Sequence, residues 1–256
     1  MNHKDSIRMR IATLTALMIS GLCFNTTAAG KAKPVQVFIL AGQSNMQGQG
    51  VVSMNHEQYY NGGKGNLEWS TKHSKTAPMM THLKDADGKW VVRDDVRISF
   101  KAKDKAREGG LTVGYTGYGS SSHIGPELQF GHVMGDAFEE PVLLIKTAWG
   151  GKSLYVDFRP PSSGGELGPY YTKMIEEIHA ALAALKGQEY EIAGFVWQQG
   201  WNDMVTKPAI PKYAENLMNL VSDLRKEFNV PNLPVVVGEL GNGGPSKGPG
   251  SMQSFR

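Results

Sequence analysis

The segment VQVFILAGQSNM, residues 35–46, decides the fold that this sequence predicts. Its first part, Val35 to Leu40, is an almost continuous apolar run, which is typical of parallel strands that are buried on both faces. Gly42 and Ser44 follow at once on a polar turn. The segment therefore predicts a buried strand whose carboxyl end opens into a polar loop.

Further apolar runs predict the other strands, and helices connect them. The clear runs are Val142 to Lys146, Ile192 to Trp197 and Pro234 to Leu240. Apolar residues at helical spacing indicate one helix from about Tyr170 to Lys186 and another that is opened by Pro211. This alternation predicts an α/β fold with a doubly wound parallel sheet. In such folds, ligands bind beyond the carboxyl ends of the strands.

A stretch from about residue 50 to residue 124 interrupts the alternation with Gly, Lys, Asp and His. It predicts a long surface elaboration with at most one strand of the central sheet, at about Asp95 to Phe100. Long loops in compact domains are usually functional or partly mobile, which is the basis for this interpretation. The charged run from Lys101 to Arg107 is interpreted as a solvated face.

The first 29 residues have the three-part layout of a secretory signal peptide. Lys4, Arg8 and Arg10 precede a mostly apolar segment that ends near Phe24, and Ala29 closes a run of small residues. A membrane anchor is the alternative, but about 14 apolar residues fall short of the roughly 20 that span a bilayer. We therefore expect export to the periplasm or the extracellular space, and a mature domain over residues 30–256 that does not bind membranes.

Composition and charge exclude several classes of protein. A chain of 256 residues with 40% hydrophobic and 20% charged residues predicts one ordinary globular core. The net charge of +3 falls to about +1 without the leader, which has three basic residues and one acidic residue, so no nucleic-acid partner is indicated. The single cysteine, Cys23, lies in the leader after Leu22, which disfavours lipid attachment and leaves the mature domain without a thiol.

Three loops at the predicted strand ends contain the candidate chemistry. Ser44 is either a nucleophile whose own amide helps to bind an oxyanion or a helix N-cap, and its position alone leaves both open. Gly150 and Gly151 let the backbone of the second loop approach a ligand. This is no phosphate-binding loop, because Lys146 stands where that motif needs its first glycine. The third loop, Gln198 to Asp203, is either a cluster of donors or an ordinary polar turn.

Taken together, the three loops resemble a known superfamily. The motifs are GQSNM at residues 42–46, WGG at residues 149–151 and WQQGWND at residues 197–203. In order and spacing they resemble blocks one, two and three of the SGNH hydrolases, most of all the sialate O-acetylesterase-like branch, from roughly Pro34 to the C-terminus. The resemblance implies a flavodoxin-like three-layer α/β/α sandwich that hydrolyses acyl, typically acetyl, esters on carbohydrates without a metal or organic cofactor. An ordinary α/β-hydrolase is excluded, because the chain has no Gly-x-Ser-x-Gly elbow.

The resemblance also implies a role for each loop. Ser44 would attack the ester carbonyl, while its amide, a loop glycine (Gly151, or Gly150) and the Asn202 side chain hold the oxyanion. The residues expected to contact the acetylated carbohydrate are Gln43, Asn45, Gly150 and Gln199. Three tryptophans, Trp149, Trp197 and Trp201, suit sugar stacking as well as acyl contact, which leaves a lipase-like SGNH enzyme as a weaker alternative.

The chain departs from the family pattern in two ways. Trp201 stands where family members usually have glutamate, although Asp203 is retained. The family's catalytic histidine lies near the C-terminus with an aspartate three residues before it, and no histidine follows His179 here. The seven histidines are at positions 3, 56, 73, 82, 123, 132 and 179.

We interpret the histidines of the mature domain as structural or solvent-facing, with His179 on a helix surface and His123 or His56 as weaker candidates for the base. We therefore expect a chain that is truncated relative to its family. Its alternative function is that of a catalytically impaired remnant, or a carbohydrate-binding derivative, of such an esterase.

Overall fold

The computed structural model describes residues 32–102, 105–118 and 123–241. The predictions for the leader, for Cys23 and for the end of the chain lie outside the described residues. Within the described part of the chain, no helix has the length and apolar character needed to cross a membrane.

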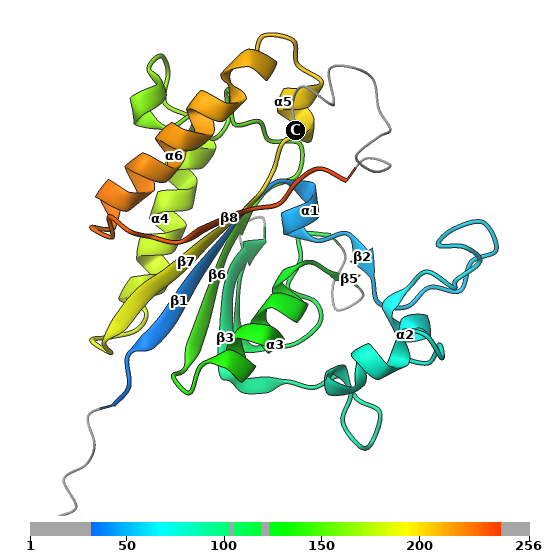
Figure 1. Ribbon diagram of the computed structural model, residues 1–256. Helices are drawn as coiled ribbons and strands as arrows, with labels where there is room; N and C mark the ends of the chain where they lie inside the picture. Colours follow the sequence, from blue (N-terminus) through cyan, green and yellow to red (C-terminus); the bar gives the residue numbers. More distant parts are fainter. Residues whose placement is uncertain (1–31, 103–104, 119–122, 242–256) are drawn as a thin grey trace, which may run out of the picture. The chain divides into compact units, whose positions relative to one another are not determined.

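A six-stranded sheet with the order β4-β3-β6-β1-β7-β8 forms the centre of the described domain (Figure 1). The strands are β1 (Val35–Gly42), β3 (Arg93–Ala102), β4 (Lys105–Leu111), β6 (Val142–Ala148), β7 (Tyr190–Gln198) and β8 (Val235–Val237). Neighbouring strands run parallel, except that β4 pairs antiparallel with β3. The predicted α/β class with a mainly parallel sheet is confirmed.

The order of the strands refines this prediction. Counted along the chain, the parallel strands are arranged 2-3-1-4-5, because β6 lies between β1 and β3. The flavodoxin order is 2-1-3-4-5, in which the first two strands are neighbours. Apolar runs identify strands without encoding their neighbours, so the sequence could not distinguish the two orders. The consequence is that β1 is flanked by β6 and β7.

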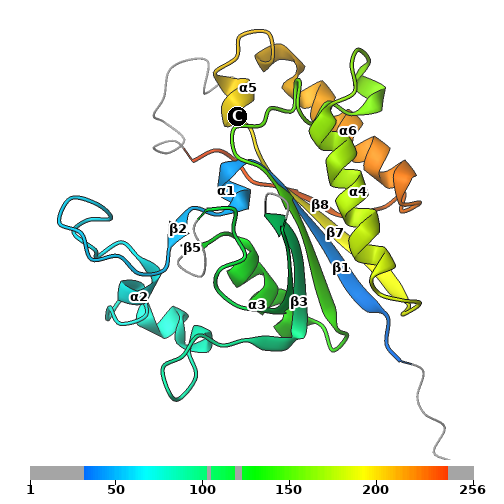
Figure 2. The ribbon, with the colours of Figure 1, turned by 180° about the vertical axis from the view of Figure 1, so that it is seen from behind.

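Helices cover both faces of the sheet, which explains why β1 is apolar throughout. The predicted helices are α4 (Pro169–Ala183) and α6 (Tyr213–Glu227), which pack on one face, whereas α3 (Glu127–Ala137) packs on the other (Figures 1 and 2). Ile39 belongs to the core under α4 and α6, and the next residue, Leu40, belongs to the core under α3. Both side chains are buried.

The elaboration contains more of the sheet than the sequence predicts. It supplies β3, as expected, and also β4, which forms the edge of the sheet. The pair Gly109 and Gly110 obscures β4, because glycine is rare in strands. Part of the charged run is not solvated, since the Arg107 guanidinium donates hydrogen bonds to the carbonyl oxygens of Gly114 and Thr116.

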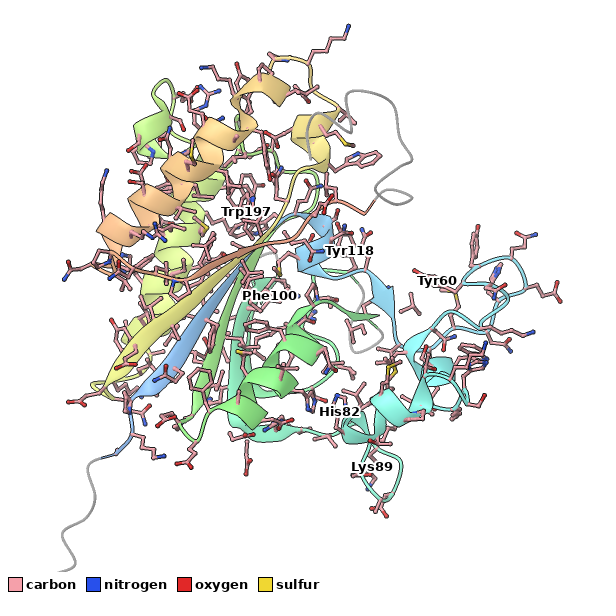
Figure 3. All side chains as sticks on the ribbon, in the orientation of Figure 1. Tyr60, His82, Lys89, Phe100, Tyr118 and Trp197 are labelled. Carbon is pink, nitrogen blue, oxygen red and sulfur yellow. The ribbon has the colours of Figure 1, made fainter. Side chains whose placement is uncertain are left out.

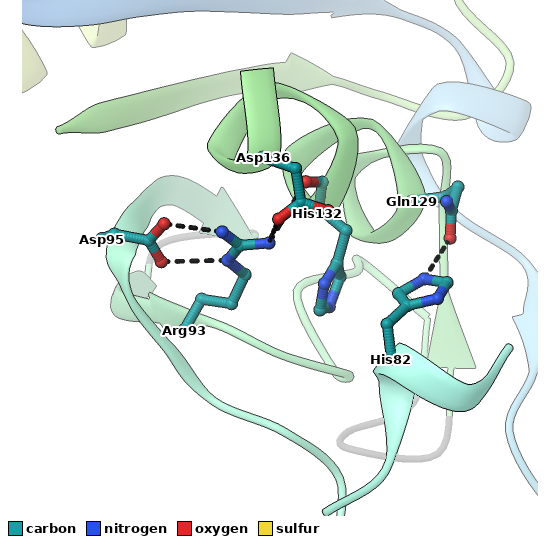
Figure 4. Close-up of polar contacts among 6 residues, drawn as sticks. All are labelled: His82, Arg93, Asp95, Gln129, His132 and Asp136. Carbon is teal, nitrogen blue, oxygen red and sulfur yellow. Dashed lines mark hydrogen bonds and ion pairs between the residues drawn. The ribbon is translucent and has the colours of Figure 1, made fainter. Parts of the chain in front are cut away.

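The remaining elements are short. They are α1 (Ser44–Gln47), β2 (Gly50–Val51), α2 (Leu67–Ser70), η1 (Ala77–Met79), η2 (Thr81–Leu83), β5 (His123–Ile124), η3 (Pro161–Ser163), α5 (Trp201–Met204) and η4 (Ile210–Lys212). The element η2 lies against α3, where His82 Nε2 is 2.9 Å from Gln129 Oε1 and the His82 ring contacts the His132 ring (Figure 4). Nearby, Arg93 bridges Asp95 and Asp136.

A carboxylate on α4 is buried without a close partner. The Glu177 side chain is 11% exposed, and its nearest cation, Lys173 Nζ, is 4.0 Å from Oε1. Within the described residues, neither carboxylate oxygen forms a hydrogen bond. Burial raises the pKa of Glu177 to about 7, although the charges of Lys173 and Lys101 oppose this shift. The folded protein therefore holds a proton on Glu177 up to nearly neutral pH.

The substitution Glu177→Gln is expected to stabilise the protein at pH 8 and to have little effect at pH 4. The pKa of Glu177 is higher in the folded than in the unfolded chain, so the free energy of unfolding falls as the pH rises from about 4.5 to about 7. Glutamine removes this loss, which amounts to at most about 3 kcal/mol. Urea denaturation at both pH values measures it, with the exposed and distant Glu57→Gln as control. Equal effects at both pH values would contradict the assignment.

Candidate active site

The three predicted loops follow adjacent strands. In the sheet register, Gly42 of β1 pairs with Ala148 of β6 on one side and with Gln198 of β7 on the other. The strands are parallel, so the loops leave the same edge of the sheet, and Figure 1 shows α1 and α5 together at that end. The structure thus brings the three predicted loops together at one edge of the sheet.

Ser44 is presented by a tight turn. Gly42 has a φ of 152°, and a Cβ at this position would collide with the carbonyl oxygen of Gln198. Ser44 is the first residue of α1, with Gln43 as N-cap and no side-chain capping bond, so the N-cap interpretation of Ser44 is wrong. Met46, two residues after Ser44, is fully buried and anchors α1. Among the described residues, none forms a hydrogen bond with the Ser44 hydroxyl or amide.

A chain of hydrogen bonds ties the three loops together. Gln43 Nε2 donates to Asn202 Oδ1 at 3.2 Å, and Asn202 Nδ2 donates to the carbonyl oxygen of Gly151 at 2.9 Å. Gln43 Oε1 in turn accepts from the amide of Gly200 at 3.2 Å. Gln43 thus uses its carboxamide to position the third loop, and Asn202 keeps one Nδ2 hydrogen for a ligand.

The two glycines of the second loop differ in what they offer. The Gly150 amide donates to Gln47 Oε1 at 2.7 Å, so its hydrogen is already used. Gly151 has a φ of 73°, a conformation that favours glycine. Its amide forms no hydrogen bond with any residue in the described part of the chain. Of the two alternatives that the sequence left open, the geometry favours Gly151 as an oxyanion donor.

Asp203 holds the second and third loops together. Its side chain is fully buried and accepts hydrogen bonds from the amides of Leu154 and Tyr155, each at 2.8 Å. Gln199 Nε2 donates to the same carboxylate and to the Lys152 carbonyl oxygen. Burial raises the pKa of Asp203, while these hydrogen bonds oppose the rise. The sequence singled out this residue without finding its role, because both amides lie far away along the chain.

A cavity of about 300 Å³ lies over the ends of β1 and β7. Its lining residues are Gln43, Ser44, Asn45, Gln198, Gln199, Trp201 and Leu240. Four predicted site residues therefore line one cavity, and the hydrogen bonds of Gln43 and Asn202 connect them to Gly151. Gln199 Oε1 is buried with no hydrogen-bond partner among the described residues, whereas its Nε2 is occupied.

Of the described residues that line this cavity, none is a histidine or a carboxylate. His179 lies on the surface of α4, as expected, and pairs with Glu227. The His56 ring packs on Tyr59, and the His132 ring on His82. His132 has a lowered pKa, first because it is buried and second because His82 and Arg93 are close. The general base is thus not identified among these side chains.

Two of the three tryptophans that the sequence proposed for sugar contact are core residues. Trp197 is 0% exposed and Trp149 is 8% exposed. Figure 3 shows Trp197 between the sheet and the helices α4 and α6. Trp201, by contrast, is 45% exposed and lines the cavity. The sequence could not separate them, because all three follow or end strands.

Behind the site lies an ion pair that sequence reasoning missed. Lys146 Nζ is 2.6 Å from Glu127 Oε2, and both side chains are fully buried. Lys146 also donates to the Tyr115 carbonyl oxygen, and Glu127 Oε1 accepts from the Gly125 amide. Gly125 is packed directly against Gly48, which ends α1. The pair therefore supports the helix that carries Ser44.

These features define an α/β protein with a polar cavity at the carboxyl edge of its sheet, and comparisons with known proteins place it further. The family described as carbohydrate esterase, sialic acid-specific acetylesterase (SASA) matches residues 34–254. A probable carbohydrate esterase of Arabidopsis thaliana is 26% identical over 219 residues, which cover 82% of this chain and 71% of the relative. The chain therefore belongs to the sialic acid-specific acetylesterase family of carbohydrate esterases, and the family expected from the three loops is confirmed.

Solved structures share the fold. A crystal structure of an Arabidopsis thaliana protein has a TM-score of 0.54 at 18% identity, over 87% of this chain and 79% of that chain. A carbohydrate acetylesterase from Xanthomonas citri has a TM-score of 0.51 at 16% identity, over 81% of this chain and 41% of that chain. NanS has a TM-score of 0.51 at 13% identity, over 81% of this chain and 68% of that chain.

Proposed function

We propose that this protein hydrolyses O-acetyl esters on carbohydrates with Ser44 as the nucleophile. The observation that carries the proposal is the Ser44 hydroxyl, which lines a cavity and is not engaged by any described residue. Ser44 Oγ would bond to the acetyl carbonyl carbon as its proton passes to a base. The bond between the acetyl carbon and the sugar oxygen then breaks, and the sugar oxygen takes up that proton. Water next attacks the acetyl-serine carbonyl, which releases acetate and returns a proton to Ser44 Oγ.

Three donors are available for the oxyanion of this reaction. They are the amides of Ser44 and Gly151 and the second Nδ2 hydrogen of Asn202, none of which is used by a described residue. Donors that are fixed before the reaction stabilise the developing charge by about 3 to 4 kcal/mol each. Gln43 would contribute mainly by fixing Asn202, while Asn45 and Gln199, which line the cavity, would contact the sugar or acetyl group. The Gly150 amide already donates to Gln47, so Gly150 would contribute to substrate contact only because the lack of a side chain lets the backbone come close.

A carbohydrate-binding protein without turnover is the second candidate. It is favoured by one observation, which is that no histidine lines the cavity among the described residues. A serine esterase without a base keeps oxyanion binding and substrate binding but loses most of its rate. Both functions use the same cavity, so the two candidates differ in the proton transfer alone.

Acetate release distinguishes the two candidates. The protein is incubated with O-acetylated xylotriose and with an O-acetylated sialic acid, with and without imidazole, and Ser44→Ala is run in parallel. Release without imidazole that depends on Ser44 indicates an esterase with its own base. Release that needs imidazole and still depends on Ser44 indicates a serine site without a base. No Ser44-dependent release under either condition overturns the esterase in favour of the binding protein.

We further propose that residues 1–29 are a signal peptide and that residues 30–256 form the exported domain. The order of basic, apolar and small-residue segments in the leader supports this. The proposed substrate class also supports it, because O-acetylated polysaccharides occur outside the cell. N-terminal sequencing of the mature protein tests the cleavage after Ala29.

Within the described residues, no group of three or more metal-ligating side chains is placed to hold a metal ion.

A further inference from the structure

Among the described residues that line the Ser44 cavity, one has an aromatic side chain. Trp201 lines the cavity and is 45% exposed, although indole is among the side chains that gain most from burial. The two other tryptophans near these loops, Trp149 and Trp197, lie in the core. The exposure of Trp201 is therefore a property of its position and not of the loops in general.

The backbone on both sides of Trp201 is held by hydrogen bonds. The amide of Gly200, the preceding residue, donates to Gln43 Oε1, and two residues later the buried Asp203 carboxylate holds Leu154 and Tyr155. The Trp201 carbonyl oxygen accepts from the Val205 amide at 3.2 Å. An aromatic group on a fixed backbone loses little conformational freedom when a ligand covers it, which is what a stacking surface requires.

We propose that Trp201 is a specificity-determining residue on which the sugar ring of the acetyl ester stacks while the acetyl group occupies the Ser44 cavity. This inference rests on the proposed function and assigns the recognition of the leaving group to one side chain. The C–H face of a sugar ring is apolar and fits an indole face, whereas Asn45 and Gln198 in the cavity wall offer polar groups. Trp201 therefore binds the carbohydrate part of the substrate, and the cavity binds the acetyl part.

The test compares substrates with the same acetyl group and different alcohols. With O-acetylated xylotriose and an O-acetylated sialic acid, Trp201→Ala is expected to raise KM about tenfold on at least one sugar, while Trp201→Phe retains most of the affinity. With ethyl acetate, which has no ring, kcat/KM should change less than about twofold. The control is Val205→Ala, because Val205 is 60% exposed at the C-cap of the same short helix and does not line the cavity. Equal losses on sugar and ethyl acetate, or no loss on either sugar, overturn the proposal.

A binding measurement separates this inference from the proposed reaction. In the Ser44→Ala background, which cannot form acetyl-serine, saturation-transfer NMR with the same two acetylated sugars should show contact with the sugar ring protons. Addition of Trp201→Ala should reduce that signal and weaken binding about tenfold, while Val205→Ala should not. If the wild type shows no Ser44-dependent turnover but Trp201→Ala weakens binding in the Ser44→Ala background, the esterase proposal fails and the stacking proposal stands. If Ser44→Ala binds both sugars equally with and without Trp201, the stacking proposal fails.

Discussion

Replacing Ser44 by alanine is expected to lower acetate release from an O-acetylated sugar by about 10³-fold or more. The substitution removes the atom that forms the acyl-enzyme bond. It leaves the oxyanion donors in place, which are the backbone amides of residues 44 and 151 and the Asn202 side chain. In comparable serine hydrolases, loss of the nucleophile costs up to about 10⁶ in turnover, and the residual rate comes from the oxyanion donors and from binding. The loss should appear in kcat, because the hydroxyl contributes little to ground-state binding.

The control for this substitution is Ser53→Ala. Ser53 is exposed beyond β2 and does not line the cavity, so its removal should leave acetate release unchanged. Circular dichroism and the midpoint of urea denaturation show whether Ser44→Ala has folded. A folded Ser44→Ala protein that releases acetate at the wild-type rate would exclude Ser44 as the nucleophile, whatever its affinity for the sugar.

The main strands and helices were predictable because burial on both faces leaves a plain signal. Ile39 and Leu40 point into different cores, so β1 contains no polar alternation and stands out in the sequence. Strand β4 was not predictable in the same way, since as an edge strand it contains charged residues and two glycines. The order of β6 and β1 was hidden for another reason, which is that strand pairing depends on contacts between distant residues.

The site was predictable as far as its loops, and not in how they are connected. Residue types at strand ends singled out the three loops, and the family resemblance then made Ser44, Asn202 and the two glycines the candidates. The structure then shows that the Gly150 amide donates a hydrogen bond to Gln47. It also shows that the Asp203 carboxylate accepts a hydrogen bond from the loop about fifty residues earlier in the chain. Such hydrogen bonds depend on side-chain directions that no local pattern records. The N-cap alternative for Ser44 failed for a similar reason, because Gln43 takes that place.

The ion pair of Lys146 and Glu127 has the geometry of a structural support for α1. Both groups are fully buried, and each has a second partner, the Tyr115 carbonyl oxygen for Lys146 and the Gly125 amide for Glu127. Burial lowers the pKa of Lys146, although the Glu127 charge opposes this shift. A buried pair often adds little net stability over an apolar pair, yet removal of one partner leaves the other charge unpaired.

Lys146→Met is therefore expected to lower the free energy of unfolding by about 3 to 5 kcal/mol, because Glu127 would remain buried without its cation. The double variant Lys146→Met/Glu127→Gln should recover most of this loss, since glutamine is neutral and its Oε1 still accepts from the Gly125 amide. Urea denaturation of the wild type, both single variants and the double variant closes the cycle. Lys33→Met, which breaks the exposed pair with Glu139, serves as the control and should have little effect. If the losses of the two single variants simply add in the double variant, the groups act independently and the support of α1 must come from packing at Gly48 and Gly125 alone.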